Sequence, residues 1–365
     1  MASLHEVLGY AVKHGASDIH LCVGSPPACR IDGNIRFFGE DKLTPANTDE
    51  YLNEILDEKQ RTTFEDTGDT DVALSIPGLG RFRVNCLMQR SSVGIIMRHV
   101  KGKIMAFEEL NLPKSMEQVA MTRRGLCLIT GTTGSGKSTT LASVIDHINR
   151  NRREHIITLE DPIEFLHQNK RSLVTQREIT IDTEDFETAL RAAMREDPDV
   201  ILIGEMRDAE TFHASTSAAE TGHLVFSTLH TTNAMLTIDR IMDMFPMEQH
   251  SQIRSQLSLQ LKYTIAQRLI PAADGKGRVA TVEVMYNSPA IAALIRDNEL
   301  KKIPNAIAAG KDEGMQTFNM SLVDLVQSGL VKEEDALNFS DNPDELSMNL
   351  KGIYLASSRG GILKK

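Results

Sequence analysis

The residues best suited to chemistry in this chain form the segment Gly131-Thr-Thr-Gly-Ser-Gly-Lys-Ser138. Its spacing fits the P-loop pattern G-x-x-x-x-G-K-[ST]. In such a loop the glycines let backbone N–H groups surround a phosphate, the lysine pairs with the outer phosphates, and the serine hydroxyl binds Mg²⁺. The pattern predicts a nucleotide and Mg²⁺ site, whose binding residues are Thr132, Thr133, Gly134, Ser135, Gly136, Lys137, Ser138 and Thr139.

The sequence on both sides of this segment suits a P-loop. Residues 126–130 predict a buried strand, and residues 141–148 predict an amphipathic helix. A helix that starts near Lys137 points the positive end of its dipole at the phosphates. This context favours a nucleotide site over the alternative, a chance glycine-rich turn.

Acidic residues follow two further apolar strands. Residues 155–159 lead into Glu160-Asp-Pro-Ile-Glu164, and residues 200–203 lead into Gly204-Glu205-Met-Arg-Asp208. Ligands of open α/β sheets bind at the carboxyl ends of parallel strands. A P-loop enzyme often has a metal-binding aspartate after the second of these strands, but here that position is Gly204. We therefore expect Glu205 to activate the attacking water, and the first acidic group to help hold Mg²⁺ through water. The alternative for Glu205 is a helix cap.

Two histidines flank the strand predicted within residues 221–232. His230 falls at its carboxyl end, where the nucleotide is expected, and is the better candidate for sensing the γ-phosphate. His223 falls at the other end, which indicates a structural role or a place at a subunit boundary. A lone histidine is more often only packed in the protein, and that alternative stays open for both.

A small α+β domain is predicted before the P-loop, ending near residues 101–103. Arg81 and Arg83 share one face of a predicted strand because side chains alternate along a strand, and Arg98 on the next strand could join them. They are either solvated edge-strand arginines or arginine fingers that reach a phosphate on another subunit or domain.

The remaining pattern predicts mostly helices. We expect helices over 44–64, one long helix over 249–269, and helices from residue 288 onward. A helical linker is expected over 107–122, where residues 105–112 resemble an adapter loop and Pro113 breaks the helix. Residues 274–277 predict a turn between two strands, of which the second covers 278–286.

Composition excludes several classes of protein. The chain has 365 residues, enough for two or three domains, and 41% of them are hydrophobic. A net charge of −10 argues against a protein built to grip nucleic acid. The four cysteines show no zinc spacing, and neither a signal peptide nor a transmembrane segment is expected.

Taken together, these motifs resemble the secretion ATPase superfamily, and within it the PilT/PilU-like branch of type IV pilus retraction ATPases. The resemblance rests on the P-loop, on Thr158-Leu-Glu-Asp-Pro-Ile-Glu164, on the Gly-Glu-Met-Arg-Asp box at 204–208, and on the histidine box at 221–230. It extends to Ala16-Ser-Asp-Ile-His20 and Gly314-Met-Gln-Thr317, and therefore covers nearly the whole chain.

The resemblance implies an α/β fold with four parts. These are an N-terminal PAS-like domain over 1–101, a linker over 102–122, a RecA-like ATPase core over 123–288, and a helical C-terminal region with a tail over 289–365. It implies catalytic roles for Glu205, Glu164, Arg81, Arg83, Arg98 and His230, nucleotide contacts from Glu160 and His223, and Mg²⁺ on Ser138 with water-mediated help from Glu164 and Glu205.

The resemblance also implies a biological role, in which a homohexamer hydrolyses ATP to retract a type IV pilus. Its expected partners are the inner-membrane platform protein of the pilus machinery and paralogous ATPases, and its expected place is the cytoplasm, peripheral at the inner membrane. Extension ATPases carry a four-cysteine zinc insert that is absent here. The retraction signature Ala-Ile-Arg-Asn-Leu-Ile-Arg-Glu is only partly kept over 290–297, where Ala292 and Ala293 depart from it. An accessory, PilU-like motor is therefore an alternative.

Two further alternatives belong to other classes. A RecA-like nucleic-acid motor would share the P-loop, but it would be expected to carry basic, aromatic tracts, and this acidic chain has no tryptophan and five tyrosines. A nucleotide-sensing scaffold would bind ATP without hydrolysing it, which Glu205 and the acidic group argue against.

Overall fold

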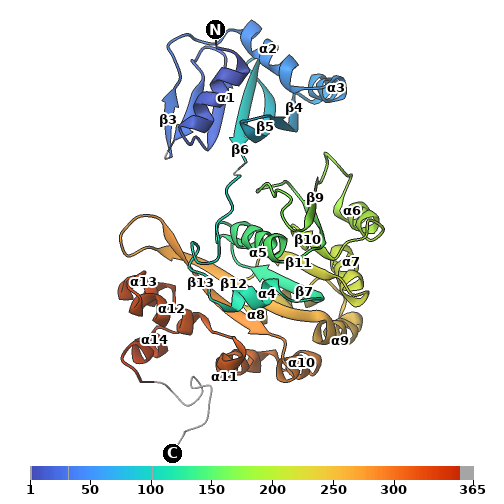
Figure 1. Ribbon diagram of the computed structural model, residues 1–365, viewed down its shortest axis with the longest axis vertical. Helices are drawn as coiled ribbons and strands as arrows, with labels where there is room; N and C mark the ends of the chain where they lie inside the picture. The colour runs from blue at the N-terminus through green and yellow to red at the C-terminus, as the bar shows by residue number, and fades with distance from the viewer. Residues whose placement is uncertain (1, 32, 101, 354–365) are drawn as a thin grey trace, which may run out of the picture. The chain divides into compact units, whose positions relative to one another are not determined.

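The computed structural model describes residues 2–31, 33–100 and 102–353, which separate into two compact units (Figure 1). The first unit is Met1–Lys103 with the short segment Ile163–Leu166. The second unit is Ile104–Pro162 with His167–Lys365. The tail expected at the end of the chain lies outside the described residues. Within the described residues, no helix combines the length and the apolarity needed to cross a membrane.

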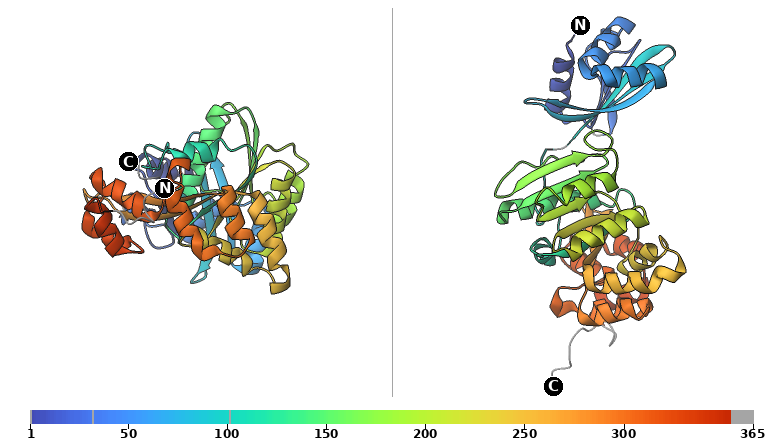
Figure 2. Two further views of the ribbon diagram at one scale, coloured as in Figure 1. Left: turned by 90° about the horizontal axis from the view of Figure 1, so that it is seen from below. Right: turned by 90° about the vertical axis from the view of Figure 1, so that its right-hand side faces the viewer.

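In the first unit, helices pack on one face of an antiparallel sheet (Figure 2). The described strands of this sheet number six, in the order β3-β2-β1-β6-β5-β4. The core lies between the sheet and residues of α1 and α2 such as Leu8 and Tyr51, both fully buried. The elements are α1 (Leu4–Lys13), β1 (Asp18–Cys22), β2 (Ala28–Ile31), β3 (Asn34–Phe37), α2 (Pro45–Ile55), α3 (Glu58–Thr67), β4 (Asp69–Ile76), β5 (Gly80–Gln89) and β6 (Ser92–His99).

The expected single helix over 44–64 was wrong, because two helices occupy this stretch. Leu56 adopts an extended conformation, with φ −94° and ψ 134°, and ends α2. Asp57 then begins α3 as its N-cap, since its carboxylate accepts a hydrogen bond of 2.8 Å from the backbone N–H of Gln60. The first N–H groups of a helix have no partner within the helix, and the Asp57 carboxylate satisfies one of them at the start of α3.

The second unit is built on a mixed sheet. Its described strands number seven, in the order β13-β12-β7-β11-β10-β8-β9, and all neighbouring pairs are parallel except β12 and β13. The strands are β7 (Gly125–Thr130), β8 (His155–Glu160), β9 (Leu173–Glu178), β10 (Val200–Ile203), β11 (Leu224–Leu229), β12 (Leu261–Pro271) and β13 (Arg278–Tyr286).

Helices cover both faces of this second sheet. α4 (Ser115–Ala120) and α5 (Lys137–Asn151) share one core with it. Along β7, Cys127 and Ile129 face that core, whereas Leu126 and Leu128 face the other. The opposite core includes α6 (Phe186–Ala193), α7 (Ala209–Glu220), α8 (Ala234–Met242), α9 (His250–Gln260), α10 (Pro289–Arg296) and α11 (Ile303–Ala309). A further core joins the sheet to α12 (Phe318–Gln327), α13 (Glu333–Phe339) and α14 (Pro343–Leu350).

The long helix expected over 249–269 was wrong. α9 ends at Gln260, Leu261 is extended, and the chain continues as β12 between β7 and β13. The β-branched residues Thr264, Ile265 and Ile270 favour a strand, and pairing with two neighbours outweighs the helical preference of the Gln- and Leu-rich sequence before them.

The linker over 107–122 is helical only after Pro113, the residue expected to break it, and the loop expected over 105–112 is confirmed. Only α4 is helical there, and the residues before it form turns. Asn111 has a positive φ of 53°, and Pro113 cannot continue a helix from the preceding turn, so the helix begins only at Ser115.

Candidate nucleotide site

The P-loop joins the end of β7 to the start of α5, as its sequence predicts. Three of its glycines have positive φ, at 152° for Gly131, 77° for Gly134 and 90° for Gly136. A Cβ atom on Gly131 would lie 2.4 Å from Ser135 Oγ and 2.5 Å from the carbonyl oxygen of Gln267. Side chains are therefore excluded where the loop folds most tightly, which leaves its backbone available to an anion.

The first residues of α5 complete this cradle. Gly136 precedes the helix as its N-cap and provides no capping side chain. The ammonium group of Lys137 donates hydrogen bonds to the carbonyl oxygens of Gly131 at 2.8 Å and Thr132 at 3.2 Å, and Lys137 is 8% exposed. Ser135 Oγ is buried without a hydrogen-bond partner among the described residues. These groups fit a phosphate at the positive end of the helix.

Gln267 of β12 fixes this loop, although the sequence analysis did not identify it. Its side-chain amide donates a hydrogen bond of 2.8 Å to the carbonyl oxygen of Ser135, and its Oε1 accepts one of 2.7 Å from Thr140 Oγ1. Because it was assigned to a helix, its place beside β7 could not be foreseen. The turn predicted over 274–277 was the available signal, since a turn between two strands requires a strand before it.

Glu205 and His230 come together at the carboxyl edge of the sheet. They follow the adjacent parallel strands β10 and β11, and Glu205 Oε1 lies 3.2 Å from His230 Nε2. Thr228 Oγ1 donates a hydrogen bond of 2.7 Å to the carbonyl oxygen of Gly204, and the N–H of Met206 donates one of 3.0 Å to the carbonyl oxygen of Thr228. The backbone on both sides of Glu205 is therefore held by β11.

Arg207 is the second partner of Glu205, and the sequence analysis gave it no role. Its Nε lies 2.7 Å from Glu205 Oε2, and its Nη1 lies 3.5 Å from Asp161 Oδ2. The hydrogen bond to Glu205 raises the pKa of the Arg207 guanidinium above its ordinary value. Arg207 and His230 together orient the carboxylate of Glu205.

Gly204 occupies the position where many P-loop enzymes have a metal-binding aspartate. A Cβ atom there would lie 3.3 Å from the carbonyl oxygen of Leu159 and 3.4 Å from Glu160 Cα. The ends of β8 and β10 approach closely at this point. A side chain at 204 would therefore crowd the backbone of β8, and the first acidic residue after β10 is Glu205.

The other predicted residues are spread over different places. Glu160 ends β8 and accepts hydrogen bonds from Thr158 at 2.7 Å and Gln176 at 3.0 Å. His223 precedes β11, where its Nδ1 lies 2.9 Å from the carbonyl oxygen of Ala218, and the structure does not bring it to the P-loop of the same chain. Glu164 is exposed and belongs to the short segment grouped with the first unit. Their functional roles stay predictions.

The three N-terminal arginines share one face of the first sheet. Arg83 on β5 lies directly opposite Arg98 on β6, and Arg81 is two residues along β5 from Arg83. Phe82 and Val84, which alternate with these arginines along β5, point into the core, so the arginines lie on the other face.

Arg98 already has an anionic partner. Its Nε donates a hydrogen bond of 2.8 Å to Asp18 Oδ1. Burial raises the pKa of the Asp18 carboxyl, but hydrogen bonds from Ser17 and Arg98 outweigh it, and the resulting pKa is below the ordinary value. Arg98 would have to leave this carboxylate to reach a phosphate, whereas Arg83 makes no ion pair within the described residues.

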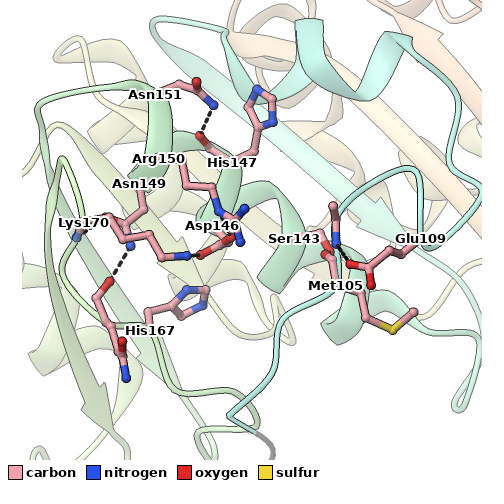
Figure 3. Close-up of polar contacts among 12 residues, drawn as sticks. Met105, Glu109, Ser143, Asp146, His147, Asn149, Arg150, Asn151, His167 and Lys170 are labelled. Atoms are coloured by element: carbon pink, nitrogen blue, oxygen red, sulfur yellow. Dashed lines mark hydrogen bonds and ion pairs between the residues drawn. The ribbon is translucent and has the colours of Figure 1, made fainter.

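Polar contacts tie the middle of α5 to two other segments (Figure 3). Ser143 Oγ donates a hydrogen bond to the carbonyl oxygen of Met105, and the His147 ring stacks on Phe107 at 5.1 Å. On another side, Asp146 forms ion pairs with Arg150 and Lys170. The helix that carries Lys137 is thereby attached to the segment that precedes α4.

His167, beside this ion-pair cluster, provides a test of acid sensitivity. Burial lowers the pKa of its imidazole to about 4, a change that Lys170 reinforces and Asp146 opposes. The unfolded chain therefore binds this proton more readily, and stability falls as pH drops from the ordinary histidine range toward 4. From pH 7 to 5, wild type should lose about 1–2 kcal/mol more unfolding free energy than His167→Gln, as measured by urea titration. Equal losses would contradict this assignment.

Among the described residues, no group of three or more His, Cys, Asp or Glu side chains is placed to hold a metal ion. In a P-loop, Mg²⁺ takes its ligands from phosphate, from water and from a hydroxyl, a position that Ser138 fills in the motif.

Comparison with known proteins agrees with this geometry. A family model described as type II/IV secretion system protein matches residues 1–336. The chain is 46% identical over 339 residues to the type IV pilus retraction ATPase PilT of Pseudomonas aeruginosa, covering 93% of this chain and 98% of the relative. It is 41% identical over 346 residues to the type IV pilus ATPase PilU of the same organism, covering 95% and 91%.

Solved structures show the same likeness. The crystal structure of the pilus retraction motor PilT with bound ADP matches with a TM-score of 0.87 and 46% identity, covering 95% of this chain and 99% of that chain. The ATPase DotB of Legionella pneumophila matches with a TM-score of 0.73 and 26% identity, covering 91% and 94%. The α/β fold with two sheets is thus that of PilT and other secretion ATPases.

Proposed function

The chain belongs to the type II/IV secretion system protein family, and from that premise we propose that it hydrolyses ATP to drive type IV pilus retraction. The observation that carries this proposal is Glu205, held 3.2 Å from His230 at the sheet edge to which the P-loop also belongs. The likeness to PilT, which extends over nearly the full length of both chains, supports the assignment to retraction.

In the proposed reaction, the P-loop backbone and Lys137 bind the phosphates of ATP, and Ser138 is a ligand of Mg²⁺. Bound Mg²⁺ would neutralise charge on the phosphates. Glu205 aligns the attacking water, with its carboxylate oriented by Arg207 and His230. Such catalysis depends mainly on positioning and on charge stabilisation.

We assign the remaining predicted features to the same proposal. The first unit corresponds to a PAS-like domain, residues 123–288 to a RecA-like core, and residues from 289 onward to a helical C-terminal region. Chains assemble as a homohexamer in which Arg81, Arg83 and Arg98 of one subunit approach ATP bound by another, and His223 lies at a subunit boundary. Glu160 and Glu164 help to hold Mg²⁺ through water.

The proposed motor transmits movement through residues 102–122. The contacts of Ser143 with Met105 and of His147 with Phe107 support this role, because they connect the P-loop helix to that segment. A shift of α5 on nucleotide binding or release would then move the segment as a rigid body. The ring is proposed to act in the cytoplasm on the inner-membrane platform protein of the pilus machinery.

A deletion strain tests the proposed function. Cells that lack this gene should have longer or more numerous pili and should lose twitching, and a plasmid-borne wild-type gene should restore both where Glu205→Gln does not. Electron microscopy and a twitching assay measure these results. Unchanged pili and twitching after deletion of this gene together with its paralogues would refute a role in retraction.

An accessory, PilU-like role is the second candidate, favoured by Ala292 and Ala293 within α10, which depart from the retraction signature. The 41% identity to PilU, beside 46% to PilT, is compatible with it. In that case single deletion leaves twitching intact when the principal motor is fully active, and a defect appears once that motor is impaired.

A further inference from the structure

The backbone that carries His230 is a short loop of residues 230–233, the His230 loop. It lies between β11, which ends at Leu229, and α8, which begins at Ala234. The His230 side chain is 47% exposed, and its Nε2 lies 3.2 Å from Glu205 Oε1. Packing therefore holds the imidazole ring only in part, and its distance to Glu205 depends on where the loop backbone is held.

Arg268 of β12 donates a hydrogen bond to the His230 loop. Its Nη2 lies 3.3 Å from the carbonyl oxygen of Thr232, two residues after His230. The Arg268 side chain is 19% exposed. A charged donor that is largely shielded from water makes a stronger hydrogen bond than a neutral one, so Arg268 is well suited to fix a backbone carbonyl.

Glu283 of β13 secures the other end of the loop. It is 7% exposed, and its Oε1 accepts a hydrogen bond of 2.7 Å from the backbone N–H of Ala234. Burial raises the pKa of Glu283 to about 7, and a carboxyl oxygen accepts this bond in either protonation state. Glu283 lies opposite Ala266, two residues before Arg268, so Glu283 and Arg268 point to one face of the paired strands.

Consecutive residues of β12 contact the two halves of the candidate site. Side chains alternate along a strand, so Gln267 and Arg268 point to opposite faces of the sheet. Gln267 bonds Ser135 of the P-loop on one face, and Arg268 reaches the His230 loop on the other. The strand β12 thus fixes the His230 loop relative to the P-loop.

The guanidinium of Arg268 also contacts the C-terminal helices. Its Nη1 donates a hydrogen bond of 3.0 Å to the carbonyl oxygen of Phe339 at the end of α13, and its Cζ lies 4.0 Å from the centre of the Phe318 ring. Its Nη2 lies 2.7 Å from Asp341 Oδ2, but Asp341 is 61% exposed, and water weakens such an ion pair. The two carbonyl oxygens therefore orient the guanidinium.

On the premise of the proposed function, we propose that Arg268 is a positioning residue for ATP hydrolysis, which keeps His230 against Glu205 by fixing the carbonyl of Thr232. Without Arg268 the His230 loop loses this anchor, the contact between His230 and Glu205 is made in fewer molecules, and hydrolysis slows. Gln267 still holds the P-loop, so ATP binding is retained.

Steady-state ATP hydrolysis by the full chain tests this role. Arg268→Gln should lower kcat about tenfold or more and change KM less than about twofold, because a small displacement near a reaction costs up to about 10²-fold in rate. Asp341→Asn leaves both carbonyl contacts in place and should stay within about twofold of wild type. Arg278→Gln, which changes an exposed arginine of β13, is the matched control and should hydrolyse ATP as wild type does.

A double-mutant cycle separates positioning from a merely structural role. When His230 is already replaced by glutamine, Arg268→Gln should cost less than about twofold in kcat, since the group through which Arg268 acts is gone. The same fold loss in both backgrounds would overturn the proposal. A wild-type kcat in His230→Gln, or in a folded Arg268→Gln protein, would overturn it as well.

Arg268→Lys provides the measurement if Arg268→Gln does not fold. It keeps the positive charge and the hydrocarbon stem, but an ammonium lacks the planar fork that reaches two carbonyl oxygens at once. Its kcat should fall severalfold, and a wild-type kcat would count against the proposal. Absence of hydrolysis by the wild-type chain would instead refute the proposed function, whereas normal wild-type turnover with normal Arg268 variants refutes only the positioning role.

Discussion

Replacing Glu205 with glutamine is expected to lower the ATP hydrolysis rate by about 10²- to 10⁴-fold, the range for loss of a positioned general base. The amide keeps the size of the carboxylate and can still accept the hydrogen bond from Arg207, so the loop should keep its shape. Only the basic oxygen that activates water is lost. ATP binding should persist, since the P-loop is unchanged.

Phosphate release measures turnover, and a fluorescent ATP analogue measures binding. Glu210→Gln is the matched control, because Glu210 is an exposed carboxylate in the first turn of α7 that follows the same strand. That variant should hydrolyse ATP at the wild-type rate. Near-normal hydrolysis by Glu205→Gln would remove Glu205 from the catalytic role.

The second large effect is expected from neutralising Arg81, Arg83 and Arg98 together as glutamines. Under the proposed function their guanidinium groups stabilise charge on the transferring phosphate, and arginines of this kind contribute about 10³-fold or more in related enzymes. The shared, non-core face of β5 and β6 allows all three to act from one surface. Turnover should therefore fall by about 10³-fold while ATP binding changes little.

The matched control replaces Arg36, Arg61 and Arg90, three exposed arginines of the first unit, with glutamine. It changes the net charge equally and should leave turnover near wild type. Because Arg98 also pairs with Asp18, circular dichroism of each variant must first show a folded protein. The single variants then separate the roles, with a larger loss for Arg83 than for Arg98 if the Asp18 contact is kept in the active state. Unchanged turnover in the folded triple variant would exclude these arginines from catalysis.

Sequence predicted the site best where the chemistry is local. The glycines of residues 131–138 allow the tight loop whatever the rest of the chain does. The apolar strand before the loop and the helix after it are also visible in the sequence. Glu205 and His230 could be expected at one edge because each directly follows an apolar run, and parallel strands align their carboxyl ends.

The failures concern residues whose place depends on distant partners. β12 has a sequence that also suits a helix, and only its pairing with β7 and β13 decides the outcome. The contact of Gln267 with the P-loop was missed because its strand was assigned to a helix. Arg207 was visible in its box, but nothing in the spacing shows that its guanidinium turns back to Glu205 instead of toward a ligand.

The hydrogen bonds of Gln267 have an evolutionary consequence. One amide bridges Ser135 and Thr140, and a Cβ atom on Gly136 would lie 2.7 Å from its nitrogen. Positions 136, 140 and 267 are therefore not free to vary one at a time, and a lineage that exchanged Gln267 would need compensating changes in the loop. A substitution at position 267 therefore disturbs a motif more than a hundred positions earlier in the gene.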